Sequence, residues 1–328
     1  MTRALALGLS ALVLVLMLAS LLIGPASVPP MQSLRALVIA DDPLMALVMR
    51  ELRLPRSLLA ALIGAGLGFS GAVMQGYLRN PLAEPGLLGV SGAAALGAVI
   101  TLQTGLASLF PVALPLAALT GAALAVGLLA LLAGPRGGSL TLILAGIGVS
   151  ALAGAGVTLV LNLSPDPFAA NEAMFWLMGS LTDRSWSHLA LAAPFILGGM
   201  ILLATQARAL DALTLGEEAA ASLGIDLMRL RLIVMLGLAA IVGAATAVAG
   251  AIGFVGLVVP HILRRAVRAR PAALLLASAL GGAAMVLAAD IAVRLILPAR
   301  DLKLGVLMAL IGAPFFLHLI FRHRLAHS

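Results

Sequence analysis

Long apolar runs separated by short polar stretches limit the folds open to this chain more than any other feature of its sequence. A helix crosses the hydrocarbon core of a bilayer with about 20 mostly apolar residues. Suitable runs occupy residues 4–23, 57–76, 87–105, 112–133, 140–161, 187–206, 230–250, 251–264, 272–293 and 304–321. The run at 251–264 is short enough to be tilted or half-buried rather than a full crossing. We therefore predict an all-α integral membrane protein with about ten transmembrane helices, in one transmembrane domain that covers residues 1–328.

The composition excludes several other classes of protein. Only 10% of the residues are charged, whereas soluble domains carry about 25%. The net charge of +7 does not indicate nucleic-acid binding, because most basic residues lie at the ends of apolar runs with few aromatic residues among them. The chain has no cysteine, which rules out thiolate catalysis and thiolate metal sites. Gly64, Gly68 and Ala72 follow a small-residue spacing that lets helices approach closely in lipid.

The distribution of basic residues predicts the orientation of the chain. An even number of crossings leaves both termini on one side of the membrane. More than half of the Lys and Arg residues fall on that side, so the positive-inside rule predicts cytoplasmic N- and C-termini. On this topology Glu84 belongs to an inner loop. The first run could also be a signal peptide, although its length favours a retained helix.

Several basic residues fall on the outer side, where the same rule disfavours them. Arg53 and Arg56 directly precede the second long run, with Pro55 placed to begin its helix, and Arg294 follows the ninth. Either these side chains reach to lipid phosphates, or they receive an acidic partner, because Arg pairs bidentately with carboxylates. Asp290 is the one ionisable residue that we expect within a span. Its position one helical turn before Arg294 predicts a structural ion pair.

One interior segment, residues 211–231, has the sequence of a helix that faces water. Thr214 and Glu217 have the spacing of a capping box, which predicts a helix of about two and a half turns beginning there. Gly224 is placed to end this helix in the left-handed conformation, and Asp226 to cap a second helix. A helix this short is marginal alone in water, so it either packs against a partner or serves as a solvated linker.

No sequence feature indicates an enzyme active site. The single lysine, Lys303, follows no glycine-rich phosphate loop, and the five histidines lack the spacing of a metal site. A many-span protein with a cytosolic docking helix, external arginines and no energy source of its own suggests a permease that a separate ATPase drives. The alternative is a secondary transporter or channel that acts alone, which normally carries more charged residues within its spans.

Five stretches, spread in order along essentially the whole chain, carry a family resemblance. They are RLPRSLLAALIGAGLGFSGAVMQGYLRNPLAEPGLLGVSGAAALG (53–97), FWLMGSL (175–181), LGEEAAASLGI (215–225), AGAIGFVGLVVPHILR (249–264) and LIGAPFFL (310–317). These stretches resemble the FecCD permease family, the membrane subunits of type II ATP-binding cassette importers for iron-siderophores, haem and cobalamin. The resemblance implies the type II importer permease fold and a multi-pass place in a bacterial inner membrane. It favours import of an iron chelate, a siderophore or haem, with cobalamin as the alternative.

The resemblance also implies partners and sites. The permease would pair with a second copy as a homodimer, bind two cytosolic ATPase subunits, and receive its ligand from a periplasmic or lipid-anchored substrate-binding protein. No cofactor or metal is implied in this chain, because ATP and Mg would bind to the ATPase. ATPase coupling would fall on Leu215, Gly216, Glu217, Glu218, Ala221, Ser222, Leu223 and Gly224. Binding-protein docking would fall on Arg53, Arg56 and Arg294, and a cytoplasmic gate on Asn80, Leu82, Ser139 and Leu140.

Three points limit this transfer of roles. Asn80 could equally cap the next helix instead of forming a gate. The stretch AVRARPAALL (266–275) replaces a Gly-x-Asp-His-Arg-like turn of the family, which makes this inner loop more basic and a second candidate contact with the ATPase. The stretch DLKLG (301–305) replaces Glu-x-Pro-x-Gly near Arg294 and would reshape the outer rim.

Overall fold

The computed structural model describes residues 1–24, 29–39, 42–110, 112–134, 138–296 and 302–325, and over these residues the chain is helical with no strand. The long helices and α14 are α1 (Arg3–Leu22), α4 (Leu54–Tyr77), α5 (Val90–Gln103), α7 (Ala113–Ala133), α8 (Ser139–Asn162), α10 (Trp186–Ala204), α13 (Leu227–Ala249), α14 (Val255–Leu263), α15 (Pro271–Ile296) and α16 (Leu304–Leu325). Shorter pieces connect them: α2 (Pro30–Val38), α3 (Pro43–Leu47), η1 (Val48–Arg53), η2 (Pro85–Leu88), α6 (Leu106–Leu109), α9 (Pro167–Leu177), α11 (Ala207–Leu213) and α12 (Glu217–Ser222).

Each predicted apolar run contains a helix, but the lengths of these helices differ. Seven helical segments are long and apolar enough to cross a membrane: α1, the continuous segment from Pro43 to Tyr77, α7, α8, α10, α13 and α15. α5 and the part of α16 up to Leu319 are shorter apolar helices. α14 has 9 residues, so it rises by about 14 Å and covers only half of the hydrocarbon core. The helical membrane fold is confirmed, while ten full crossings stay a prediction.

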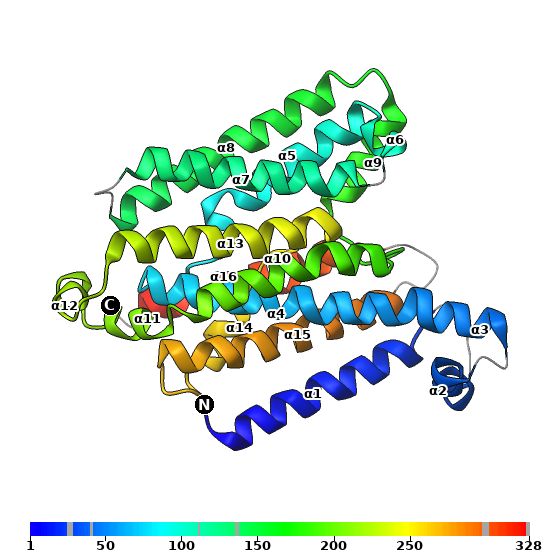
Figure 1. Cartoon of the computed structure of the whole chain (residues 1–328), viewed down its shortest axis with the longest axis horizontal. Helices are drawn as coiled ribbons and strands as arrows, with labels where there is room; N and C mark the ends of the chain where they lie inside the picture. Colours follow the sequence, from blue (N-terminus) through cyan, green and yellow to red (C-terminus); the bar gives the residue numbers. More distant parts are fainter. Residues whose placement is uncertain (25–28, 40–41, 111, 135–137, 297–301, 326–328) are drawn as a thin grey trace.

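The helices lie side by side with α4 and α13 in the middle, α1 along one edge and α8 along the other (Figure 1). Most of α4 and α13 is buried, whereas α1 and α8 are largely exposed. α12, the beginning of α1 and the end of α16 lie at one end of the bundle, which we call the α12 end (Figure 1). α2 and α3 lie at the opposite end, the α2 end. The predicted topology likewise places the two termini and the polar helix on one side.

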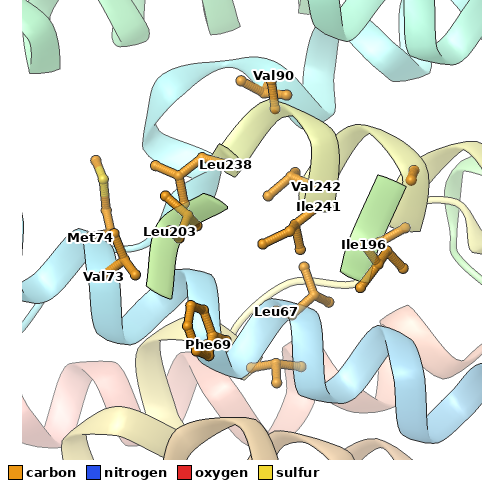
Figure 2. Close-up of a cluster of buried hydrophobic side chains, with 14 of the residues drawn as sticks. Leu67, Phe69, Val73, Met74, Val90, Ile196, Leu203, Leu238, Ile241 and Val242 are labelled. Carbon is orange, nitrogen blue, oxygen red and sulfur yellow. The ribbon is translucent and has the colours of Figure 1, made fainter. Parts of the chain in front are cut away.

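Aliphatic side chains fill the space between α4, α10 and α13. Figure 2 shows Leu67 of α4, Ile196 and Leu203 of α10, and Ile241 of α13 gathered between the three helices, and all four are buried. In lipid the hydrophobic effect does not drive such contacts, because the acyl chains are equally apolar. Close van der Waals packing therefore holds these helices together.

Glycines bring the backbones of α4 and α15 into direct contact. A Cβ atom built on Gly64 would lie less than 3.0 Å from the carbonyl oxygen of Gly282, and one on Gly68 would meet the carbonyl oxygen of Ser278 equally closely. Real Cβ atoms essentially never approach so near. The small-residue spacing of α4 therefore allows the close helix approach that the sequence predicts.

Candidate functional site

The polar helix predicted to begin at Thr214 is shorter than expected. α12 begins at Glu217, and Gly216 occupies its N-cap with a φ of 108°. The predicted capping box is wrong, because the Thr214 hydroxyl donates to the carbonyl oxygen of Asp211 at 2.7 Å and Thr214 ends α11. This local hydrogen bond to Asp211 competes with the predicted bond to the backbone of α12. The first turn of α12 therefore has no side-chain cap.

The other end of this segment forms as predicted. Gly224 is left-handed with a φ of 85°, and the side chain of Asp226 caps α13. Ala220 is fully buried and anchors α12 on the bundle, whereas Leu215 and Leu223 are 69% and 65% exposed. The two glutamates of the first turn are exposed as well. α12 thus presents a mixed apolar and acidic surface, of the kind that another protein can cover.

Asp211 and Glu217 provide polar contacts between the α11–α12 segment and the rest of the bundle. Asp211 Oδ1 accepts a hydrogen bond at 2.9 Å from the backbone N–H of Ala272, in the first turn of α15. Glu217 forms an ion pair at 3.7 Å with Arg79, just beyond α4, and both side chains are nearly half exposed. An exposed pair of this length contributes little stability. Asp211 is therefore the firmer of the two links.

The basic loop after α14 is also attached to α4. Arg264 Nη2 donates to Gln75 Oε1 at 2.9 Å, and the buried Gln75 amide donates in turn to the carbonyl oxygen of Leu257 at 3.2 Å. Arg268 adopts a left-handed φ of 55° in the turn before α15. Of the second departing stretch, Asp301 lies outside the described residues.

Two of the predicted docking arginines cap the end of α1. The last carbonyl groups of a helix have no partner within it. Arg53 Nη1 donates to the carbonyl oxygens of Leu21 at 2.9 Å and Leu22 at 3.2 Å, and Arg294 Nη1 donates to that of Ile23 at 2.7 Å. Arg53 is the N-cap residue of α4 and Arg294 lies in the last turn of α15, so the two side chains fix the end of α1 to α4 and α15.

Asp290 lies at the centre of this arginine cluster, which consists of Arg53, Arg56, Arg294 and Asp290. Its side chain is 1% exposed and accepts hydrogen bonds from Arg56 Nε at 3.1 Å and Arg56 Nη2 at 2.7 Å. It also accepts one from Arg294. The predicted Asp290–Arg294 ion pair is confirmed. Arg56 joins from 234 residues away, a contact that sequence spacing cannot show.

A cavity of about 280 Å³ opens beside the arginine cluster at the α2 end and is also lined by Asp183 and Arg184. Arg184 is not among the predicted docking residues, although it lines the same cavity. Burial lowers the pKa of its guanidinium, and Asp183 acts in the opposite direction. Arg56 keeps 18% of its side chain exposed, against 6% for Arg294. Among the predicted docking residues, Arg56 thus offers more surface than Arg294, and docking itself stays a prediction.

The predicted gate residues lie at the α12 end. Asn80 Oδ1 accepts from the N–H of Leu82 at 2.9 Å, so it shapes its own turn and does not cap the helix that follows. Ser139 is the first residue of α8, and Leu140 is 69% exposed. The loop meets α8 deeper in the bundle, where the backbone of η2 packs on Gly146. The gate assignment stays a prediction.

Glu84 lies in the loop after α4, as predicted, but this loop folds back among the helices. Its Oε1 accepts a hydrogen bond at 2.6 Å from the backbone N–H of Phe254, the residue before α14. Glu84 lines a cavity of about 90 Å³ together with Thr246 and Leu67, and Leu67 is near the middle of α4. Asp290 lies within α15, as predicted, whereas Glu84 belongs to the loop between α4 and η2. The hydropathy of the sequence does not show this position, because the loop after α4 is polar yet turns back into the bundle.

Backbone hydrogen bonds bring two of the matching stretches together near the α2 end. The N–H of Ser180, in FWLMGSL, donates to the carbonyl oxygen of Ala249 at 2.8 Å, where AGAIGFVGLVVPHILR begins. The N–H of Gly305 donates to Gly179 at 3.2 Å. Gly305 is the last residue of the stretch DLKLG (301–305). This stretch differs from the family pattern Glu-x-Pro-x-Gly in its first residues but has the same final glycine, which forms this junction.

The fold and these sites define a class: a many-span helical membrane protein with a short polar helix at one end and a charged cavity at the other. The chain belongs to the FecCD transport family, whose model matches residues 12–322. It is 41% identical over 278 residues to the hemin transport system permease protein HmuU of Yersinia pestis, covering 84% of this chain and 83% of that one. It is 44% identical over 277 residues to the vitamin B12 import system permease protein BtuC of Vibrio cholerae, covering 83% and 82%.

A solved structure agrees with this assignment. A protein assigned as a metal-chelate type ABC transporter, in an inward-facing conformation, superposes with a TM-score of 0.88 at 32% identity. The match covers 98% of this chain and 100% of that one. The chain is thus a multi-pass permease of the ATP-binding cassette class. Permeases of this class are not enzymes themselves, since partner subunits hydrolyse the ATP, and they work with substrate-binding partners.

Proposed function

We propose that this chain imports an iron chelate, either a siderophore complex or haem, across the inner membrane of a bacterium. Support comes from the similarity to a hemin permease and to a metal-chelate type transporter. Import of cobalamin is the alternative, supported by the similarity to a vitamin B12 permease. Uptake of radiolabelled haem, ferric siderophore and cobalamin by the reconstituted transporter decides among them. Uptake of cobalamin alone would refute the iron-chelate assignment.

In this proposal two copies of the permease form the translocation path. Two cytosolic ATPase subunits bind at the α12 end, and a periplasmic or lipid-anchored protein delivers the ligand at the α2 end. The permease alternates access to the two sides and forms no covalent bond with its ligand. The arginine cluster supports docking at the α2 end, because a cavity lined by several guanidinium groups attracts carboxylates. Asn80, Leu82, Ser139 and Leu140 would form the gate at the α12 end.

The observation that carries the proposal is α12 itself. It is a polar helix with exposed leucines and glutamates at one end of an otherwise apolar bundle, within a stretch that matches the family. Because α11 is attached to α15 through Asp211, a force on α12 reaches a helix that packs along the full length of α4. This connection suits a contact that converts movement of the ATPase into movement of the spans.

Reversing the charges on α12 tests this coupling. Exchange of Glu217 and Glu218 for Lys should abolish ATP-driven uptake and the stimulation of the ATPase, while the permease still inserts into the membrane. The matched control is Glu172→Lys, on exposed α9 at the other end of the bundle, which should transport normally. Normal uptake by the α12 variant would refute the coupling role, and uptake without any ATPase would indicate a carrier that acts alone.

A further inference from the structure

Glu84 is a carboxylate that lies beside the middle of α4, away from both ends of the bundle. It precedes η2 in a loop that leaves the end of α4 and folds back between the helices. The neighbouring Ala83 and Leu88 are buried. Phe254, to which Glu84 is bound, is followed by the 9 residues of α14, which lead back to the α12 end. That length places Phe254 about 14 Å inside the bundle, near the middle of the hydrocarbon core.

The carboxylate completes the beginning of α14. The first N–H groups of a helix have no partner within it, and Phe254 offers no side-chain cap of its own. Glu84 Oε1 supplies the acceptor at 2.6 Å from 170 residues away. A negative charge at this position is also favoured by the helix dipole. Non-helical backbone at membrane depth requires such satisfaction, because neither lipid nor water supplies it there.

Phe254 carries the contact onward to α16. It has a φ of 67°, in the left-handed region that a residue with a side chain rarely adopts. Its ring lies against the backbone of α16, since a Cβ atom built on Gly312 would fall less than 3.0 Å from that ring. On its other side, α14 meets α4 through the close contact of Gly256 with Gly71. Glu84 thus joins the inner loop to α14, and through α14 to α4 and α16.

We propose that Glu84 is a positioning residue of transport: its hydrogen bond to Phe254 holds the loop with η2 against α14, so that this loop and α14 move together when the ATPase moves α12. The proposal rests on the proposed transport function. An intramembrane ionisable side chain generally has a functional role, because it is costly to keep. Here the role follows from geometry, since one carboxylate secures the meeting point of three segments that lie far apart in the sequence.

Glu84→Ala and Glu84→Gln distinguish positioning from general stability. The complete transporter in proteoliposomes should, with Glu84→Ala, take up ligand more slowly by about tenfold or more, the factor set by losing a hydrogen bond to a charged group. ATP hydrolysis should continue, so more ATP is spent for each ligand transported. Glu84→Gln keeps an oxygen acceptor for Phe254 and should restore most of the coupling. Asp166→Ala, which removes a carboxylate cap from exposed α9, is the matched control and should transport normally.

A second measurement does not depend on transport. The natural chain has no cysteine, so Ser91→Cys places a single thiol on the cavity that Glu84 lines. Maleimide labelling should be faster with Glu84→Ala than with Glu84 or Glu84→Gln. If Glu84→Ala fails to insert, Glu84→Asp replaces it, because the shorter side chain withdraws the carboxylate from Phe254.

Several outcomes overturn the proposal. One is a rate of ligand uptake by Glu84→Ala equal to that of the wild type. Another is an equal labelling rate for Glu84→Ala and Glu84→Gln, or for Glu84→Asp and Glu84→Gln where Glu84→Ala does not insert. A parallel loss of uptake and ATP hydrolysis that Gln does not restore would indicate a structural role alone. If the wild-type protein takes up no ligand while labelling still depends on Glu84, the transport assignment fails and the Glu84 contact remains.

Discussion

Removal of the Asp290 carboxylate should destabilise the bundle more than any exposed acidic substitution. Asp290 is 1% exposed and accepts hydrogen bonds from Arg56 and Arg294. Asp290→Ala leaves two guanidinium groups, 18% and 6% exposed, without their counter-ion. Breaking one side of a buried ion pair costs about 3–5 kcal/mol. Against a typical stability of about 5–15 kcal/mol, this is a large loss.

The loss can be measured by unfolding the detergent-solubilised chain with a denaturing detergent and following tryptophan fluorescence. Trp186 reports on the α2 end, because its Nε1 donates to the carbonyl oxygen of Arg50 at 2.9 Å. Asp166→Ala is the control, since loss of an exposed helix cap costs about 1 kcal/mol. Asp290→Asn keeps an acceptor of similar shape and should fall between the two. If Asp290→Ala loses no more stability than the control, the central role of this carboxylate is refuted.

Arg56→Gln separates the structural role of the arginine cluster from the predicted docking role. Arg56 does not cap α1, so the stability loss should be smaller than for Asp290→Ala. If Arg56 also receives an acidic partner, binding of the delivery protein should weaken, and more so at low salt than at high salt. Unchanged binding at every salt concentration would leave Arg56 with its structural role alone.

Two further predictions follow from packing and from the attachment of α12. Gly64→Ala should force α4 and α15 apart by about 1 Å and cost about 1–3 kcal/mol, whereas Gly127→Ala, with open space around it, should preserve or raise stability in the same unfolding assay. Equal stability of the two variants would contradict the contact. Asp211→Ala should reduce uptake while ATPase subunits still bind, because α11 loses its hydrogen bond to α15, and a transport rate like that of the wild type would exclude Asp211 from the coupling route.

Predictions that depend on a continuous stretch of sequence are confirmed where the interaction is local. Asp226 caps α13 and Gly224 takes the left-handed conformation, because each depends only on residues a turn away. The predicted capping box of Thr214 is wrong, although it is local too. The hydroxyl had two local acceptors or donors to choose from, and it bonds to the carbonyl oxygen of Asp211 instead of to the backbone of α12. The ion pair of Asp290 with Arg294 is confirmed because the two residues are one helical turn apart.

The sequence by itself determines that this chain is a helical membrane protein, because a bilayer offers no partner for backbone polar groups and a long apolar run must satisfy them within a helix. The family follows from the matching stretches in the same way. The tertiary structure alone decides that Glu84 caps α14 and that Arg56 joins Asp290, because these partners are 170 and 234 residues apart. Their side chains meet only when the loop after α4 turns back and the helices pack. The hydropathy of the sequence predicts neither the path of the loop nor the packing of the helices.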